Sequence, residues 1–472
     1  MKRSKLLFRL LPLLPLVTGI IGFALAKMPF PDGLYQCIIM YVLNYTGDPP
    51  NVLVEIARFT APLATAGSVI ALASSLRQRL VVRWKLRHGD DVALVYGPEA
   101  EQTAMLERLG NRGVAGKDRF LPARRYILLN GETENFTFYQ THADQLKGRM
   151  VYLKCASLPA VSVAPSNLKL FCPEETAARL YWQERNVCDL WRKGGGIMQI
   201  VLLGFGKLGE ALLYQGLQNN IFDPEQRIEY HVFGDCAAFL ATHTQLHEIT
   251  DPVIPHPEPW YEALALLDQA DLVIVLEQRE QTALLQSILA ATLRREIDVF
   301  TAEDPALALL EYRKRLRPFP WQQRAMEPEL VMSDRLYILA KSINLRYAHL
   351  YSGVAETQEN LQAEWEKLNA FTRGSNISAA DYHVQRLQQL KALGPVSESS
   401  LTPEQLERLS HLEHIRWCRY HWLQNWRYGE PQNGKAKDAD LRIHTLLVPY
   451  DALSDEEKEK DRENIRVLMG IQ

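Results

Sequence analysis

The segment GFGKLG has glycines spaced as in a dinucleotide-binding loop, which makes it the clearest candidate for ligand binding in the sequence. Its key members are Gly204, Gly206, Lys207 and Gly209. Glycines between a strand and a helix let the backbone approach a pyrophosphate, which the amides at the helix N-terminus bind. Asp235 stands 26 residues after Gly209, where an acidic residue meets a ribose hydroxyl. NAD or another adenine nucleotide is therefore the expected cofactor, unless the glycines serve only the turn and helix packing.

A second set of residues suited to ligand binding lies near the C-terminus. Indole and phenol rings stack on nucleobases, and lysine and arginine side chains bind phosphates. We expect a binding pocket formed by Arg373, Asn376, His414, Trp417, Trp426, Tyr428, Lys435, Arg442 and His444, with Lys437 as a further cation. The alternative is that the aromatic rings only fill the core of a small helical domain.

Four residues of metal-ligating types share one predicted helix: His411, His414, Cys418 and His421. A single rigid helix cannot surround one ion tetrahedrally, so a second segment would have to supply ligands. We therefore expect no metal. No acid or base suited to hydride transfer follows the glycine loop, so we also expect that the chain is not an enzyme.

The elements that must carry these residues begin with two apolar segments near the N-terminus. Leu10–Ala26 and Phe59–Leu76 contain seventeen and eighteen residues without a charge, and each with its flanks can cross a bilayer. Two spans are the simplest interpretation. A cleaved secretory signal is the alternative for the first segment, because basic residues precede it and Ala24-Leu25-Ala26 has the form of a cleavage site.

Basic residues flank the outer ends of these two segments. They are Lys2, Arg3, Lys5 and Arg9 before the first segment, and Arg77, Arg79, Arg83, Lys85 and Arg87 after the second. Because positive charge is retained on the cytoplasmic side, both termini are expected to be cytoplasmic. The predicted location is the inner membrane, with the chain crossing it more than once.

The segment between the two apolar runs has the pattern of a re-entrant pore. Gly33–Leu43 is apolar but only eleven residues long, too short to cross. The polar loop that follows supplies the expected pore residues, Asn44, Tyr45, Thr46, Gly47 and Asp48. An interfacial hairpin without conduction is the alternative. Glu55 and Arg58 are spaced to pair near the outer mouth.

Short apolar strands then alternate with helical patterns, which predicts two α/β units with parallel sheets. The first unit has expected strands at 92–96, 126–129, 151–154 and 168–171. It has only Gly97 in its first loop, and Glu99 and Glu101 would repel a phosphate there, so we expect a structural role. After a flexible joint at Gly194–Gly196, the second unit has expected strands at 198–203, 228–233, 272–276 and 297–300 and helices at 206–219 and 281–294.

The fold class is thus an α-helical two-span membrane module, two α/β Rossmann-like domains and a mainly α-helical C-terminal domain. The expected domains are 1–88, 89–193, 194–330 and 331–472, which fits a length of 472 residues. A formal net charge of -3 argues against a nucleic-acid duplex as partner. Six scattered cysteines without a CxxC pair exclude a disulfide framework.

Residues 1–310 resemble a two-transmembrane channel coupled to RCK/TrkA-N regulatory domains. The resemblance rests on the two spans, the re-entrant loop, the basic linker and GFGKLG. It implies a potassium channel-like pore, although the loop Asn44–Asp48 does not match the Thr-Val-Gly-Tyr-Gly type of filter.

Residues 406–468 resemble the ryanodine-receptor repeat (RyR) domain. The shared pattern is His414-x-x-Trp417, Trp426-x-Tyr428-Gly429, Arg442-x-His444, Pro449-Tyr450 and a closing helix. Asn425 stands where a glycine is usual, and Thr445 where a proline is usual. The resemblance implies a sensor of nucleotide-like ligands.

These patterns lead to the expectation of a ligand-gated, channel-like protein of the bacterial inner membrane. A pore needs several subunits around an axis, so a homo-oligomer, with a tetramer as the simplest form, is expected. The alternative is a membrane-anchored nucleotide-sensing effector, for example in antiphage defence, that perturbs the bilayer without a selective pore.

Overall fold

The computed structural model describes residues 13–89, 91–117, 120–156, 167–185, 187–194, 196–293, 296–301, 307, 309–392, 401–432 and 434–469. The chain separates into two compact units. The first contains the residues up to Val92 together with Pro122–Arg124, and the second contains the remainder.

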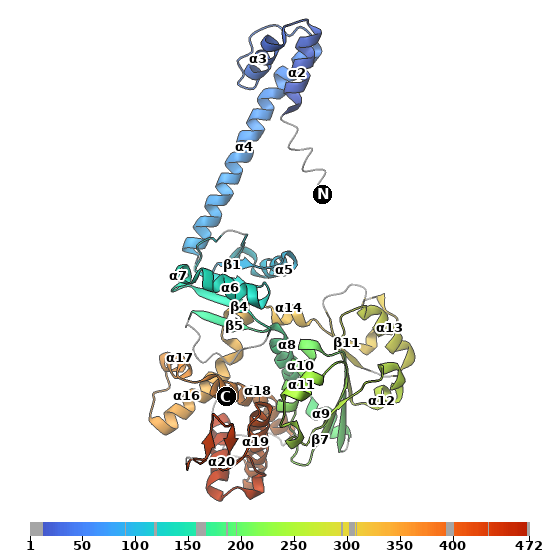
Figure 1. The fold of residues 1–472 in the computed structure, drawn as a ribbon, viewed down its shortest axis with the longest axis vertical. Helices are drawn as coiled ribbons and strands as arrows, with labels where there is room; N and C mark the ends of the chain where they lie inside the picture. Colours follow the sequence, from blue (N-terminus) through green and yellow to red (C-terminus); the bar gives the residue numbers. More distant parts are fainter. Residues whose placement is uncertain are drawn as a thin grey trace. The chain divides into compact units, whose positions relative to one another are not determined.

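The described part of the first unit is a helical bundle (Figure 1). Its helices are α2 (Leu14–Leu25), α3 (Phe30–Met40) and α4 (Val52–His88). Gly22 lets α2 approach α4 closely, because a Cβ added there would lie 2.7 Å from Cγ2 of Val54. Asn51 fixes the start of α4, since its Oδ1 accepts a hydrogen bond from the Val54 amide at 3.1 Å and its Nδ2 donates to the Gly22 carbonyl oxygen at 2.6 Å.

One helix among the described residues is long and apolar enough to cross a membrane, over Val52–Ser74 of α4. Residues 10–12 of the first expected span lie outside the described residues; in the described part this span forms the 12 residues of α2, a length of about 18 Å, which alone is short of a bilayer core. Pro15 stands in the first turn of α2, where proline is tolerated. The prediction of two spans is therefore not confirmed. Placing both termini in the cytoplasm requires an even number of crossings, so a single crossing does not support that prediction.

Outside its contacts with α2 and α3, α4 exposes many apolar side chains. Phe59, Leu63, Ile70, Leu72, Leu76, Leu80 and Trp84 all have exposed side chains. Most of the exposed large apolar side chains of the protein lie in this first unit. A soluble surface rarely carries so extended an apolar region, so this surface has the character of one that contacts lipid or another chain.

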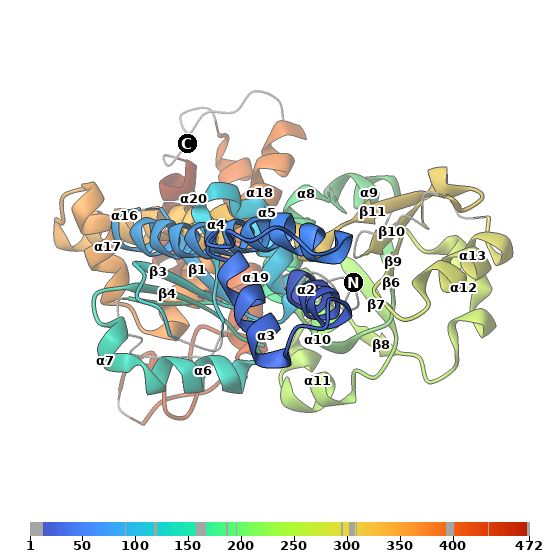
Figure 2. The same ribbon diagram turned by 90° about the horizontal axis from the view of Figure 1, so that it is seen from above.

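The second unit begins with a five-stranded parallel sheet of order β2-β1-β3-β4-β5. Its strands are β1 (Ala93–Tyr96), β2 (Gly113–Ala115), β3 (Arg125–Leu128), β4 (Met150–Lys154) and β5 (Leu168–Phe171). Its helices are α5 (Glu99–Leu109), α6 (Glu132–Thr141) and α7 (Ala143–Leu146), and Figure 2 shows α5 on one face of the sheet and α6 and α7 on the other. This is the strand order of flavodoxin-like doubly wound folds.

A six-stranded parallel sheet follows, with the order β11-β10-β9-β6-β7-β8. Its strands are β6 (Ile197–Leu203), β7 (Arg227–Phe233), β8 (Val253–Pro255), β9 (Leu272–Val275), β10 (Ile297–Phe300) and β11 (Leu316–Phe319). Its helices are α10 (Gly206–Asn219), α11 (Ala237–Thr242), α12 (Leu264–Gln269) and α13 (Gln281–Ala291). Numbered from β6, this is the Rossmann order 3-2-1-4-5-6, which confirms a Rossmann-like second sheet.

Helix α8 (Pro173–Glu184) connects the two sheets and packs on the second. Ala177, Tyr181 and Trp182 of α8 share one buried core with Leu212 of α10, and the Trp182 indole donates to the Leu212 carbonyl oxygen at 2.9 Å. The expected domain boundary at 193/194 assigns α8 to the first α/β unit, whereas its contacts place it in the core of the second. The short helix α9 (Val187–Gly194) follows α8.

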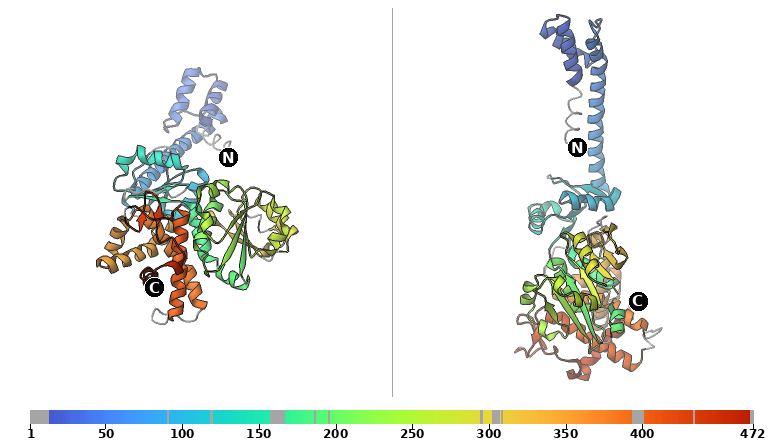
Figure 3. Two further views of the ribbon diagram at one scale, coloured as in Figure 1. Left: turned by 60° about the horizontal axis from the view of Figure 1, so that its bottom comes forward. Right: turned by 90° about the vertical axis from the view of Figure 1, so that its right-hand side faces the viewer.

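The rest of the chain is mainly helical (Figure 3). Its helices are α14 (Trp321–Ala325), α15 (Pro328–Met332), α16 (Ile338–Ser352), α17 (Gln358–Glu366), α18 (Ala370–Ala392), α19 (Pro403–Leu423) and α20 (Asp455–Met469). A small sheet of order β12-β14-β13 joins α19 to α20, with β12 (Arg427–Tyr428), β13 (Lys437–Asp438) and β14 (Ile443–His444). Thr402 and Gln405 form a capping box that starts α19.

Two buried ion pairs hold the C-terminal helices on the Rossmann-like part. Arg179 of α8 binds both carboxylate oxygens of Asp381 on α18, at 2.7 and 2.9 Å. Arg419 of α19 lies 2.6 Å from Asp251, which follows α11, and both side chains are almost fully buried. Each charge is desolvated and depends on its partner, so these pairs fix the position of α18 and α19.

Candidate functional site

The glycine loop lies where the strand order of the second sheet reverses. Gly204 follows β6 and Glu277 follows β9, and these neighbouring strands have helices on opposite sides. Gly204 has φ +92°, and an added Cβ would lie 2.7 Å from the backbone nitrogen of Glu277, so only glycine fits there. Gly206 has φ +58° with no described atom within 4 Å of its Cβ position. Ligands of doubly wound sheets bind in this crevice.

The ring of Phe205 fills the space that two glycines leave behind the loop. A Cβ added to Gly209 would lie 2.9 Å from Cδ2 of Phe205. A Cβ added to Gly234 would lie 2.9 Å from the Cβ of Phe205. Gly209 therefore serves close packing, as the third glycine of this motif does. Gly234 has a matching role that the sequence motif does not include. Lys207 is exposed and pairs with Glu210 at 3.0 Å.

Asp235 lies on the same edge of the sheet as the glycine loop, directly after β7. Its Oδ1 accepts a hydrogen bond from the Ala237 amide at 3.1 Å, in a turn just before α11. The structure thus brings Gly204, Gly206 and Asp235 to one edge, as the sequence predicts for a dinucleotide site.

The small C-terminal sheet aligns three of the expected ligand residues in one row. Tyr428 of β12 pairs with His444 of β14, and His444 pairs with Lys437 of β13. Residues in register lie on one face of a sheet, so these three side chains share a face. The face carries a phenol, an imidazole and an ammonium group side by side.

The half-buried indole of Trp417 lies against this face from α19. Its ring centroid is 4.9 Å from that of His444 in a T-shaped contact and 4.0 Å from that of His421. His414 stacks on the other side, with centroids 5.8 Å apart. The row of Tyr428, His444 and Lys437 together with Trp417 and His421 is called the aromatic–imidazole surface below.

The two imidazoles of this surface are held neutral. Burial, with Lys437 as a smaller cause, lowers the pKa of His421 to about 3 and that of His444 to about 4. Nδ1 of His421 donates to the Trp417 carbonyl oxygen at 2.8 Å, whereas Nδ1 of His444 accepts from the Leu446 amide at 3.1 Å. His421 therefore has an acceptor at Nε2, and His444 has a donor at Nε2. Within the described residues neither Nε2 has a hydrogen-bond partner.

His414 has the opposite charge state. Burial opposes its protonation, but Asp461, whose Oδ2 lies 3.3 Å from Nδ1, and Cys418 together raise the pKa of His414 to about 10. Nε2 donates to the Val448 carbonyl oxygen at 2.9 Å. His414 is thus a charged group that holds α19 to α20 and to the preceding loop, rather than a free ligand contact.

Other expected ligand residues have structural contacts. Trp426 is only 5% exposed and packs against Phe371, whose ring centroid is 4.9 Å away, so it forms part of the core. Arg373 donates to the carbonyl oxygens of Trp365 and Glu366 at 3.1 Å each. These contacts turn its guanidinium toward the end of α17. The remaining expected residues are placed as follows: Asn376 is buried on α18, Lys435 is exposed, and Arg442 donates to the Gln424 carbonyl oxygen at 3.4 Å.

The candidate metal ligands on α19 do not converge. His411 stacks on Tyr450 with centroids 4.8 Å apart, while Sγ of Cys418 lies 3.4 Å from Nε2 of His414. In the described part of the chain, no group of three or more His, Cys, Asp or Glu residues is placed to hold a metal ion.

The expected pore loop is closed by its own side chains. The Tyr45 hydroxyl donates to the Asp48 carbonyl oxygen at 3.2 Å, and the Arg58 guanidinium lies 5.8 Å from the centre of the Tyr45 ring. A Cβ on Gly47 would lie 3.3 Å from the Tyr45 hydroxyl. Asn44 and Thr46 complete this loop outside any helix or strand.

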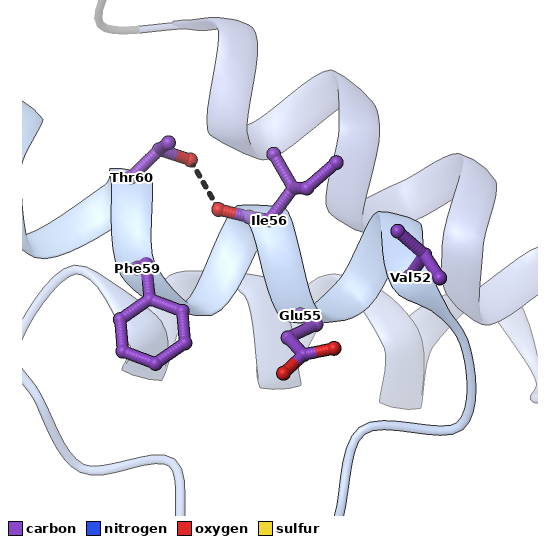
Figure 4. Close-up of a pocket in the computed structure, with 5 residues that line it drawn as sticks. All are labelled: Val52, Glu55, Ile56, Phe59 and Thr60. Atoms are coloured by element: carbon purple, nitrogen blue, oxygen red, sulfur yellow. Dashed lines mark hydrogen bonds between the residues drawn. The ribbon is translucent and has the colours of Figure 1, made fainter.

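Glu55 does not pair with Arg58, because Arg58 is directed to Tyr45. Figure 4 shows Glu55 beside Phe59 on the outer side of α4, in a shallow hollow of that helix. The hollow is lined by Val52, Glu55, Ile56, Phe59 and Thr60, and the Thr60 hydroxyl donates to the Ile56 carbonyl oxygen at 2.6 Å. All the lining residues lie on one helix, so this is a surface feature and not a ligand pocket.

Together, the fold and the site define a class of chain in which two doubly wound parallel sheets are followed by a helical domain with an aromatic–imidazole surface. The family model that matches is that of the RyR domain, over residues 397–471. This C-terminal part of the chain is a RyR domain, which confirms the resemblance predicted for residues 406–468. No curated protein and no solved structure matches the chain.

The structure explains both departures from the usual RyR pattern. Asn425 has φ +61°, a conformation that glycine adopts freely and that asparagine tolerates better than most residues. Thr445 donates its amide to the Ala436 carbonyl oxygen at 2.9 Å, a bond that a proline could not make. The two residues thus keep the loop geometry with different chemistry.

Proposed function

We propose that the chain is a membrane-attached sensor whose RyR domain binds a nucleotide-like ligand on the aromatic–imidazole surface. The observation that carries the proposal is the row of Tyr428, His444 and Lys437 beside the half-buried indole of Trp417. A flat ring, a neutral donor and a cation are groups that bind a base and its phosphate.

The hydrogen-bonding pattern supports a base as the part that is recognised. His444 has a donor at Nε2, and nucleobase edges carry acceptors. His421, which is 4% exposed among Phe371, Trp417 and Trp426, belongs to the core beside this row. Lys437 stands in register with His444, where its ammonium can receive a phosphate as a point charge.

The glycine loop supports a second site, for NAD or another adenine nucleotide. Gly204 and Gly206 have the backbone conformations that the motif needs, and Asp235 lies at the same sheet edge. When bound, such a cofactor would place its pyrophosphate at the start of α10 and a ribose at Asp235. We propose sensing rather than catalysis for this site.

We propose an oligomer, with a tetramer as the simplest form, that groups copies of α4 in the inner membrane. When the ligand binds, this assembly acts like a channel. The uncovered apolar surface of α4 supports association with lipid and other copies. An effector without a selective pore is the second candidate. It is favoured by the single crossing and by the closed Tyr45–Asp48 loop.

Ligand binding is tested by calorimetry and thermal shift of the full-length protein with NAD, ATP, AMP and cyclic dinucleotides. The double variant Tyr428→Ala/Lys437→Gln should lose at least tenfold in affinity for a ligand of the RyR domain, whereas Asp235→Asn should lose affinity only for a ligand of the glycine loop. Tyr35→Ala, at an exposed tyrosine of α3 in the first unit, is the control. If the double variant binds every nucleotide as the unaltered protein does, the proposal fails.

The output is tested by ion flux from liposomes that contain the protein, with and without the nucleotide found above. Nucleotide-dependent flux of one cation supports the channel-like form, and leakage of a large dye supports the effector. No flux and no leakage under any nucleotide would remove both forms.

A further inference from the structure

The C-terminal third of α4 carries several cations and no acidic residue of its own, and Asp90 and Asp91 follow the helix in the sequence. Arg77, Arg83 and Arg87 have exposed side chains and Lys85 is half-buried. Between Phe59 and Gly89 the sequence contains no aspartate or glutamate. Within the described residues, none of these four cations has a carboxylate at ion-pair distance. Residues 77–88 are called the basic segment below.

The apolar surface of α4 ends inside the basic segment. Leu80 and Trp84 are 64% and 65% exposed, and beyond Trp84 the exposed side chains of α4 are Arg87 and His88. From Phe59 to Trp84 a helix rises about 38 Å, which lies between the thickness of a hydrocarbon core and that of a whole bilayer. Tryptophan is enriched at the headgroup level of membranes. Trp84 therefore marks the level at which α4 leaves the bilayer.

From this position of Trp84 we infer that the basic segment binds anionic phospholipid headgroups. These headgroups belong to the leaflet at which the C-terminal end of α4 exits the bilayer. Arg83, Lys85 and Arg87 lie within one turn of Trp84, and so at the level of the headgroup phosphates. Charges this close to an anionic surface lie within the Debye length of about 8 Å and are attracted to it. The inference rests on the membrane attachment in the proposed function but not on nucleotide binding.

A lipid headgroup fits this segment better than a free phosphate. A free phosphate needs converging donors in a pocket, whereas the cations of α4 project from a single helix at several angles. The exposed side chains of Leu80 and Trp84 lie among the same cations and suit the acyl chains beside the headgroups. One amphiphilic partner therefore satisfies both kinds of side chain.

The experiment compares lipid retention in detergent by native mass spectrometry. Full-length protein is mixed with phosphatidylglycerol or with phosphatidylcholine of the same acyl chains. The test variant is Arg83→Gln/Lys85→Gln/Arg87→Gln. The control is Lys117→Gln/Lys314→Gln/Arg335→Gln, which removes the same charge from exposed positions elsewhere.

We expect the unaltered protein and the control to retain phosphatidylglycerol over phosphatidylcholine. Since each cation near an anionic surface contributes roughly a fivefold preference, the test variant should lose roughly a hundredfold of it. If the test variant prefers phosphatidylglycerol as strongly as the unaltered protein does, or if millimolar inorganic phosphate displaces phosphatidylglycerol, the inference is overturned. Flotation with vesicles separates the two proposals. Failure to float with either lipid removes the membrane attachment, whereas flotation without a preference for phosphatidylglycerol removes only the lipid site.

Discussion

Asn425 of the RyR domain donates from Nδ2 to the carbonyl oxygen of Thr242, at 2.8 Å, the last residue of α11 in the Rossmann-like domain. Its Oδ1 accepts from the Thr244 amide at 2.8 Å. Asp235 accepts a hydrogen bond from the amide of Ala237, the first residue of the same short helix. One helix of six residues thus connects the expected ribose position with the residue that precedes Trp426. Asp235 and Asn425 therefore make hydrogen bonds at opposite ends of one helix.

Two substitutions at Asn425 separate its backbone role from its side-chain bonds. Asn425→Gly keeps the left-handed conformation but removes the bonds to Thr242 and Thr244, so a loss of about 1–2 kcal/mol is expected. Asn425→Ala should cost about 1–2 kcal/mol more, because a Cβ is unfavourable at positive φ. Thermal unfolding measures both. Hydrogen exchange in α11 should rise in either variant, and unchanged protection there would refute the proposed connection.

Asp251→Asn is predicted to destabilise the protein strongly. It leaves the Arg419 guanidinium buried without its carboxylate, a loss that typically costs about 3–5 kcal/mol. Asp251 also accepts from the Ile228 amide and from Gln226, so the start of β7 should loosen with it. Asp223→Asn is the control, since the Arg408–Asp223 pair is partly exposed and should contribute less than about 1 kcal/mol. Urea unfolding followed by tryptophan fluorescence distinguishes the two, and equal midpoints would contradict the assignment.

Replacing Trp426 by alanine should mainly reduce stability, whereas replacing Tyr428 by alanine should mainly reduce ligand binding. Trp426 is buried against Phe371, so Trp426→Ala should cost about 3–5 kcal/mol of stability. Tyr428 is 55% exposed, so Tyr428→Ala should change stability by about 0.5 kcal/mol or less while weakening ligand binding. Thermal shift without a ligand measures the first effect, and calorimetry measures the second. A destabilised Tyr428→Ala protein would show that this ring also belongs to the core.

The sheets could be predicted largely from sequence, because buried parallel strands are continuous apolar runs. The bounds of β5 and β10 are the predicted ones. Strand β2 could not be predicted, because its three residues Gly113–Ala115 have too few apolar side chains to form a pattern. The first expected span can be compared only in part, because residues 10–12 lie outside the described part of the chain; the described helix runs from Leu14 to Leu25, with Pro15 in its first turn.

The binding residues were harder to predict than the fold. Trp426 and Tyr428 are both aromatic and two positions apart, and only tertiary packing makes one core and the other surface. The row of Tyr428, His444 and Lys437 depends on one parallel and one antiparallel pairing, which residue spacing does not reveal. His421 could have been found from its position four residues after Trp417, where helix geometry places the two rings side by side.

Stability of the RyR domain should fall on both sides of neutral pH, for two different reasons. The folded domain keeps His421 and His444 neutral, with a pKa of about 3 and about 4, whereas the unfolded chain protonates them near pH 6.5. Below pH 6.5 the unfolded state therefore binds more protons, and stability is lost as the pH falls toward 4. His414 has a pKa of about 10 in the folded domain, so its contribution is complete below pH 6.5 and is lost as the pH rises toward 10.

Single variants should show which histidine causes the loss of stability on the acid side and which on the alkaline side, called the acid limb and the alkaline limb below. His421→Gln keeps a side chain that can donate to the Trp417 carbonyl oxygen but cannot titrate, so the acid limb should become shallower. The limb will not vanish, because burial also lowers the pKa of His383 to about 4. His414→Gln loses its charge contact with Asp461 and should flatten the alkaline limb alone. Thermal unfolding midpoints from pH 4 to pH 10 provide the measurement. An alkaline limb that stays as steep in His414→Gln as in the unaltered protein would show that the buried His414–Asp461 pair is not its source.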